Sequence, residues 1–291
     1  MTVAARLGLG AGLIGRGPAG ETSRRMSDAE AFAAIAMAAD AGVQVIDLPA
    51  QRPDAERVLG EVLPSAAPVR IILKTALLAQ TAETVERGVV AALQRLGRDW
   101  AHALVVQNPS TLLGDEGPAI WDRLRRLKDE GRIKAIGLSA CVCDDPMGLA
   151  RRFKPDLMQL PGSLLDQRLI ADGTMGEIAA LGVSVHLRSI FMKGLLFLAG
   201  HELPADMAAM TPGLSRIRLI LAEARADPLQ AALAFALSRI EVSTVIVGVA
   251  SPSELRAALA AAAAPPPVLD WNALALNPPC LAGVQRCLAA A

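Results

Sequence analysis

Two charged residues stand at the ends of two short apolar segments in the first third of the chain. Asp47 closes the segment VQVID, and Lys74 closes VRIILK. If these segments form neighbouring parallel strands, both side chains lie at the same edge of a sheet, where barrel enzymes carry their chemistry. The pattern predicts an ion pair at a functional site, and the alternative is an ion pair whose role is structural.

The residues around this pair resemble the aldo-keto reductase family. Members of that family carry an aspartate after an apolar strand, a tyrosine in the next loop, and a lysine and a histidine at the ends of later strands. Asp47 and Lys74 match the aspartate and the lysine, and Glu56 and Gly60 match the start of the helix between them. The resemblance therefore implies a catalytic role for Asp47 and Lys74.

The tyrosine and the histidine of the family pattern are replaced. The tyrosine position is Arg52 in PAQRP, the histidine position is Gln107 in LGRDWAHALVVQ, and the chain contains no tyrosine at all. In the family, the phenol protonates the alkoxide that forms when a nicotinamide delivers hydride to a carbonyl. A guanidinium stays charged and cannot give this proton. We expect Arg52 and Gln107 to line a substrate pocket, and standard reductase activity to be impaired or absent.

The resemblance also implies a nicotinamide cofactor, NADP or NAD. The segments KAIGLSA and LMQLPG contain the residues that match the family's carboxamide ligands, and HLRSIFMKGLL matches the loop around the pyrophosphate. Glu254 falls near a position that is basic in members preferring NADP, so the sequence disfavours a 2′-phosphate. The implied cofactor-binding residues are Ser139, Gln159, Arg188, Ser189, Gly194, Leu195 and Ser251.

Apolar segments of strand length alternate with helical patterns along almost the whole chain. The strand-like segments lie within residues 6–17, 43–47, 69–75, 103–107, 133–139, 157–160, 183–188 and 244–248. Strands that alternate with helices in this number predict an α/β fold, a closed (β/α)8 TIM barrel, rather than an open sheet. We expect one domain spanning residues 1–291.

Residues that cap helices support this pattern. Ser27 followed by Glu30 predicts a capping box, Gly97 and Gly131 predict helix ends, and Asp227 before a proline predicts a helix start.

The composition limits the partners. The chain of 291 residues is 53% hydrophobic and has 29 basic and 29 acidic residues, so no overall charge favours nucleic acid or an anionic membrane. No segment reaches the roughly 20 strongly apolar residues of a membrane helix. Arg6 and Arg16 interrupt the apolar start, so we expect no signal peptide and a cytoplasmic location. Cys141 and Cys143 lack nearby histidine or acidic ligands, and no metal site is expected.

Three functions agree with these residues. The first is an aldo-keto-reductase-like oxidoreductase acting on a small-molecule carbonyl compound. The second is a catalytically silent barrel that acts as a binding or interaction protein. The third is a non-redox acid-base enzyme in which Lys74 is the base and Arg52 holds an anionic ligand.

Overall fold

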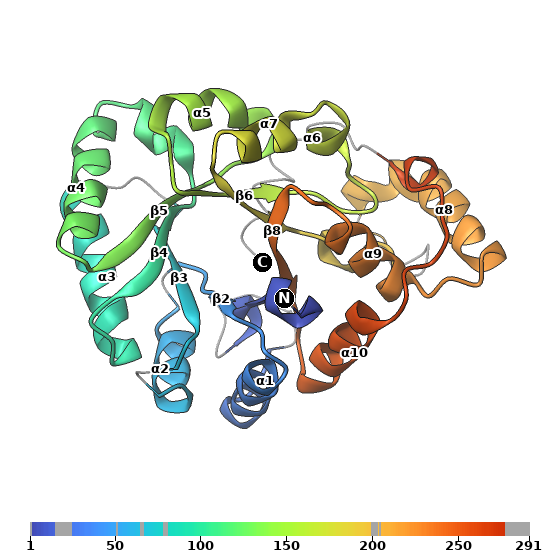
Figure 1. The fold of residues 1–291 in the computed structure, drawn as a ribbon, viewed down its shortest axis with the longest axis horizontal. Coiled ribbons are helices and arrows are strands. Elements are labelled where there is room, and N and C mark those ends of the chain that lie inside the picture. The colour runs from blue at the N-terminus through green and yellow to red at the C-terminus, as the bar shows by residue number, and fades with distance from the viewer. Residues whose placement is uncertain are drawn as a thin grey trace.

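The computed structural model describes residues 2–14, 25–50, 52–64, 67–77, 81–198, 203 and 205–276, which form a closed parallel barrel (Figure 1). Each strand pairs with the next in the chain, and the last pairs with the first. The strands are β1 (Leu7–Gly10), β2 (Val45–Asp47), β3 (Arg70–Lys74), β4 (Ala101–Val106), β5 (Ile133–Ser139), β6 (Leu157–Pro161), β7 (Ser184–Arg188) and β8 (Val242–Gly248). The predicted TIM barrel is confirmed.

Helices lie around the outside of the barrel (Figure 1). They are α1 (Asp28–Asp40), α2 (Pro53–Val62), α3 (Ala82–Leu96), α4 (Gly117–Asp129), α5 (Pro146–Phe153), α6 (Arg168–Ala171), α7 (Thr174–Ala180), α8 (Thr211–Glu223), α9 (Pro228–Leu237) and α10 (Pro252–Ala263). Short 3-10 helices include η2 (Ala11–Leu13) and η5 (Met192–Gly194). Arg16 and the end of the glycine-rich opening segment lie outside the described residues.

The predicted helix boundaries agree with the structure. Ser27 Oγ accepts the Glu30 amide at 3.3 Å and Glu30 Oε2 accepts the Ser27 amide at 3.0 Å, which completes the capping box of α1. Gly97 and Gly131 have φ angles of 61° and 76°, the left-handed conformation that glycine favours after a helix. Asp227 Oδ1 accepts the Gln230 amide at 2.8 Å and caps α9.

Side-chain alternation along the strands sets the position of the site. Alternate residues of a strand share one face, so a strand of the barrel presents every second residue to the interior. One buried apolar cluster consists of Val45, Ile72, Ala103, Val105, Ala135 and Leu157. Asp47, Lys74, Gln107 and Gln159 each lie two residues after a member of this cluster. The same alternation that fills the barrel therefore brings polar side chains to its C-terminal end. Gln107 itself lies just beyond β4, which begins earlier and ends earlier than predicted.

The contact between α2 and α3 requires a glycine. A Cβ atom added at Gly60 would lie 2.6 Å from the carbonyl oxygen of Arg95 and 3.0 Å from backbone atoms of Leu96. Backbone atoms cannot move aside as a flexible side chain does, so this position admits no larger residue without separating the two helices.

We therefore expect Gly60→Ala to lower the free energy of unfolding by about 1–3 kcal/mol, the usual effect of overpacking. Gly88→Ala is the matched control, because a Cβ at this exposed position of α3 meets nothing within 4 Å. This control should be neutral or raise stability by up to about 1 kcal/mol through helix propensity. Urea unfolding curves measure both, and equal effects of the two substitutions would contradict the packing described here.

Candidate functional site

The carboxylate of Asp47 joins three strands at the C-terminal end of the barrel. Lys74 Nζ donates to Asp47 Oδ2 at 2.6 Å, and Gln159 Nε2 donates to Asp47 Oδ1 at 2.6 Å. The Asp47 and Lys74 side chains are only 7% and 9% exposed, and Gln159 is fully buried. The ion pair that the sequence predicts is thus formed, and the amide of β6 completes the coordination of the carboxylate.

Gln159 also presents a buried acceptor that no described residue satisfies. Its amide nitrogen must face Asp47, because a carboxylate accepts hydrogen bonds and cannot donate them. The other end, Oε1, is buried and receives no hydrogen bond from the described part of the chain. Ser139 is the direct strand neighbour of Gln159 in the β5–β6 pairing and is 4% exposed. A water molecule or a ligand with an N–H or O–H group would satisfy this oxygen.

Arg52 follows β2 and Gln107 follows β4, so the two residues lie on either side of β3, which carries Lys74. Arg52 immediately precedes α2, is half-buried, and donates from Nη2 to the carbonyl of Ile14 at 3.0 Å. Gln107 is 9% exposed, and its backbone amide donates to Oγ1 of Thr75 at 3.2 Å. Arg52 thus ties the start of α2 to the segment after β1, and Gln107 is held beside the end of β3.

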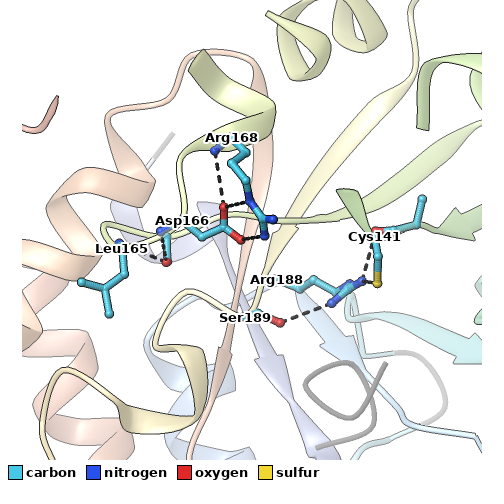
Figure 2. Close-up of polar contacts among 8 residues, drawn as sticks. Cys141, Leu165, Asp166, Arg168, Arg188 and Ser189 are labelled. Carbon is cyan, nitrogen blue, oxygen red and sulfur yellow. Dashed lines mark hydrogen bonds and ion pairs between the residues drawn. The ribbon is translucent and has the colours of Figure 1, made fainter. Parts of the chain in front are cut away.

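β7 ends in a buried guanidinium (Figure 2). Arg188 is 7% exposed, donates from Nη2 to the Ala140 carbonyl at 3.1 Å and to Cys141 Sγ at 3.4 Å, and donates from Nη1 to Ser189 Oγ at 3.3 Å. Its Nε is buried and donates to no described residue. Ser189 has a φ angle of 60°, which is strained for a residue with a side chain.

Gly194, Leu195 and Ser251 have local structural roles. The amides of Gly194 and Leu195 donate to carbonyls within the same loop, and Leu195 is 1% exposed in a second apolar cluster. Ser251 Oγ accepts the Glu254 amide at 3.1 Å and so caps α10. Any contact of Leu195 with a ligand would involve its backbone, because its side chain belongs to the core.

A histidine lies buried inside the barrel. His186 on β7 pairs with Gln159 on β6, is 3% exposed, and its Nδ1 is buried with no described hydrogen-bond partner. Burial lowers the pKa of His186 from 6.5 to about 4. Asp47 opposes this shift, and Arg70, His102 and Lys74 add to it. The spacing of His186 and Arg188 along one strand is the sequence signal that both belong to the site face.

The described residues contain no group of three histidine, cysteine, aspartate or glutamate side chains that could hold a metal ion. Among their helices, none has the length and apolar character that a bilayer crossing requires.

A closed α/β barrel whose strands carry buried polar side chains towards their C-terminal ends defines a TIM-barrel protein, and this is the face at which such barrels carry their sites. The family model "Aldo/keto reductase family" matches residues 6–274, and the chain belongs to that family. A comparison with curated proteins finds no match.

Solved structures share the fold. The holo form of aldo-keto reductase AKR11C1 from Bacillus halodurans has a TM-score of 0.72 and 20% identity, over 98% of this chain and 93% of that one. An aldo-keto reductase from Klebsiella pneumoniae in complex with NADPH has a TM-score of 0.68 and 19% identity, over 98% and 91%. A candidate aldo-keto reductase from Pseudomonas aeruginosa has a TM-score of 0.65 and 23% identity, over 89% of each chain.

The buried ion pair makes a double-mutant cycle informative. We expect Asp47→Asn and Lys74→Met each to cost about 3–5 kcal/mol of unfolding free energy, because each leaves the other charge buried without its partner. The double variant should cost about 1–3 kcal/mol less than the two single effects added together. Arg57→Met is the control, because the pair of Arg57 with Asp28 is exposed and its loss should change stability far less. Strict additivity at Asp47 and Lys74 would contradict the direct pair.

His186 predicts a dependence of stability on pH. In the unfolded chain a histidine titrates near 6.5, and in the folded protein His186 titrates near 4, so the unfolded state binds more protons between these values. Stability should therefore fall as the pH is lowered from about 6.5 to about 4, by about 3 kcal/mol from this residue alone.

Carboxylates titrate in the same range, so the measurement is the difference between wild type and His186→Gln in unfolding free energy at each pH. The difference should shrink steadily towards low pH. His102→Gln serves as the control, because His102 is only half-buried. A parallel pair of curves for wild type and His186→Gln would show that the imidazole is not held neutral.

Proposed function

We propose that this protein binds a nicotinamide cofactor at the C-terminal ends of β5 and β6 and lacks the proton donor that its family uses, so that carbonyl reduction by the usual route is impaired or absent. The observation that carries this proposal is the buried Oε1 of Gln159, an acceptor with no described donor beside the Asp47–Lys74 pair.

The chemistry of the residues suits such a cofactor. A carboxamide has an N–H₂ group that Gln159 Oε1 can accept and a carbonyl oxygen that the Ser139 hydroxyl can approach. Ser189, directly after β7, supplies a hydroxyl of the kind that binds phosphate. These residues would hold the cofactor, and Gly194 and Leu195 would stabilise the loop after β7 through their backbone hydrogen bonds. When bound, a reduced nicotinamide supplies hydride to a carbonyl carbon.

The described side chains beside the Asp47–Lys74 pair include no phenol, the general acid that the family uses. Lys74 has its charge offset by Asp47 and can stabilise a developing oxyanion electrostatically. Arg52 stays charged and gives no proton, and the Gln107 amide can orient a carbonyl oxygen without changing protonation state. The absence of the phenol therefore removes a contribution that is typically about 10²–10⁴ in rate.

The loop before α10 favours NAD over NADP. Glu254 Oε2 accepts the backbone amide of Ala250 at 2.7 Å, so its negative charge is held at the start of this helix. Ser251 keeps its hydroxyl in the cap of the helix. A 2′-phosphate at this loop would meet like charge, whereas the ribose hydroxyl of NAD would not.

The test has two stages on the full-length protein. In the first, NADH should raise the melting temperature and quench tryptophan fluorescence at millimolar concentration, and NADPH should do so more weakly. Gln159→Leu should lose the NADH response. Gln107→Leu, which removes a similarly buried amide, should keep it. Absence of any response to either cofactor in wild type would overturn the proposal in favour of a barrel that binds another ligand.

In the second stage, Arg52→Tyr combined with Gln107→His should raise the NADH-dependent turnover of a simple aldehyde by roughly 10²-fold or more, because it restores a general acid. Arg52→Phe with Gln107→His is the matched control, since it fills the same position without a hydroxyl. Brisk turnover by the wild type would show that another acid is present.

A further inference from the structure

Arg188 differs from the comparable cations of the barrel in lacking an acidic partner among the described residues. Lys74 and Arg168 are also largely buried, with side chains 9% and 16% exposed, and each forms an ion pair at 2.6 Å. Arg188 is 7% exposed and forms no ion pair with any described residue, since its acceptors are a carbonyl, a thiol and a hydroxyl. A buried charge without a counter-ion is costly, so this position has a cause other than stability.

Arg168 shows what the corresponding edge of Arg188 lacks (Figure 2). In Arg168, Nε and Nη2 together hold the carboxylate of Asp166, at 2.8 and 2.6 Å. In Arg188, the same edge has an Nε with no described acceptor and an Nη2 that reaches only the Ala140 carbonyl and the Cys141 sulfur. The Nε and Nη2 edge therefore binds a carboxylate in Arg168, whereas in Arg188 it contacts only a carbonyl and a sulfur atom.

The acidic groups of the neighbouring loops are already engaged. Asp166, in the loop after β6, is held by Arg168 and is also fixed through its backbone amide by Ser163 Oγ at 3.0 Å. Asp144, in the loop after β5, accepts the Cys141 amide at 2.7 Å. Neither forms an ion pair with Arg188, so these two described loops supply no counter-ion for it.

We infer that Arg188 binds the carboxylate of the ligand, and that the substrate class of this site is an acidic carbonyl compound such as a 2-oxo acid. The anion would accept from Nε, which has no described acceptor, and would share or replace the contacts of Nη2 with Ala140 and Cys141, with the Ser189 hydroxyl beside it on Nη1. The φ of 60° at Ser189 is a strained conformation of the kind that clusters at ligand-binding sites. The inference rests on the proposed function in placing the ligand at the same rim, but binding of the anion needs no hydride transfer.

The first experiment compares ligands that differ only in the carboxylate. Melting temperature and calorimetric titration of the full-length protein are measured with 2-oxobutanoate and with butan-2-one. We expect 2-oxobutanoate to raise the melting temperature and to bind, and butan-2-one to do neither. Arg188→Met should weaken 2-oxobutanoate binding by roughly tenfold or more, as expected for loss of a side-on charge-assisted contact. An equal response of wild type and Arg188→Met would overturn the inference.

The stability of the ligand-free variants separates a binding role from a structural one. Arg188→Met should leave the melting temperature unchanged or raise it, because it removes a buried charge that has no counter-ion among the described residues. Arg168→Met is the matched control and should lower the melting temperature, because it leaves Asp166 without its partner. If Arg188→Met lowers the melting temperature as Arg168→Met does and 2-oxobutanoate has no effect on wild type, Arg188 is a structural residue and the inference fails.

Two further arms test other sources of the anion. If Arg188→Met abolishes binding of NADH and of inorganic pyrophosphate but leaves 2-oxobutanoate binding intact, the guanidinium holds the cofactor and the substrate assignment is wrong. If wild type does not bind 2-oxobutanoate but Cys141→Ala does, Cys141 is the counter-ion of Arg188 and the inference also fails. Binding of 2-oxobutanoate through Arg188 without any NADH or NADPH binding would support the inference while removing the proposed function.

Discussion

The polar end of this barrel depends on a single carboxylate. Asp47 is buried, and both of its oxygens are engaged, one by the ammonium of Lys74 and one by the amide of Gln159. Because these partners come from β3 and β6, the carboxylate fixes the relative positions of strands that do not pair with one another. It also determines that Oε1 of Gln159 points away from Asp47, since only the amide nitrogen can donate to the carboxylate. The acceptor presented to a ligand is therefore a consequence of the ion pair.

The geometry of the strands explains why so many polar side chains gather there. A barrel strand presents every second residue to the interior, and the interior is closed by small and branched apolar residues such as Val45, Ile72 and Leu157. The next inward-facing residue of each strand lies beyond these apolar side chains. A polar residue at that step is buried by its neighbours yet faces the open end, which is the situation of Asp47 and Gln159. The position of these residues in their strands, and not an unusual backbone conformation, places polar groups in a buried environment.

The fold and part of the site could be predicted from local patterns, while the remainder depends on contacts between distant strands. The capping box of Ser27 and the glycine after α3 follow from a few adjacent residues. The Asp47–Lys74 pair follows from two strand ends and a family resemblance. The bond from Gln159 to Asp47 spans 112 positions of sequence, and no local pattern indicates it. The family resemblance indicates Arg188, and only the shared strand face indicates His186. The three-dimensional structure is needed to reveal that each has a buried nitrogen without a described partner.

The two kinds of buried charge carry different evidence about function. An ion pair inside a protein is maintained by its own energetics, because loss of either member leaves the other charge buried and unpaired. The presence of the Asp47–Lys74 pair is therefore what stability alone would require, and it is weak evidence for reductase chemistry. Arg188 has no such protection, because its described acceptors are neutral and replacing it by an apolar residue would leave no opposite charge among them. A buried cation that stability does not require therefore supports the proposal of a ligand at the end of β7 more strongly than the Asp47–Lys74 pair supports any activity.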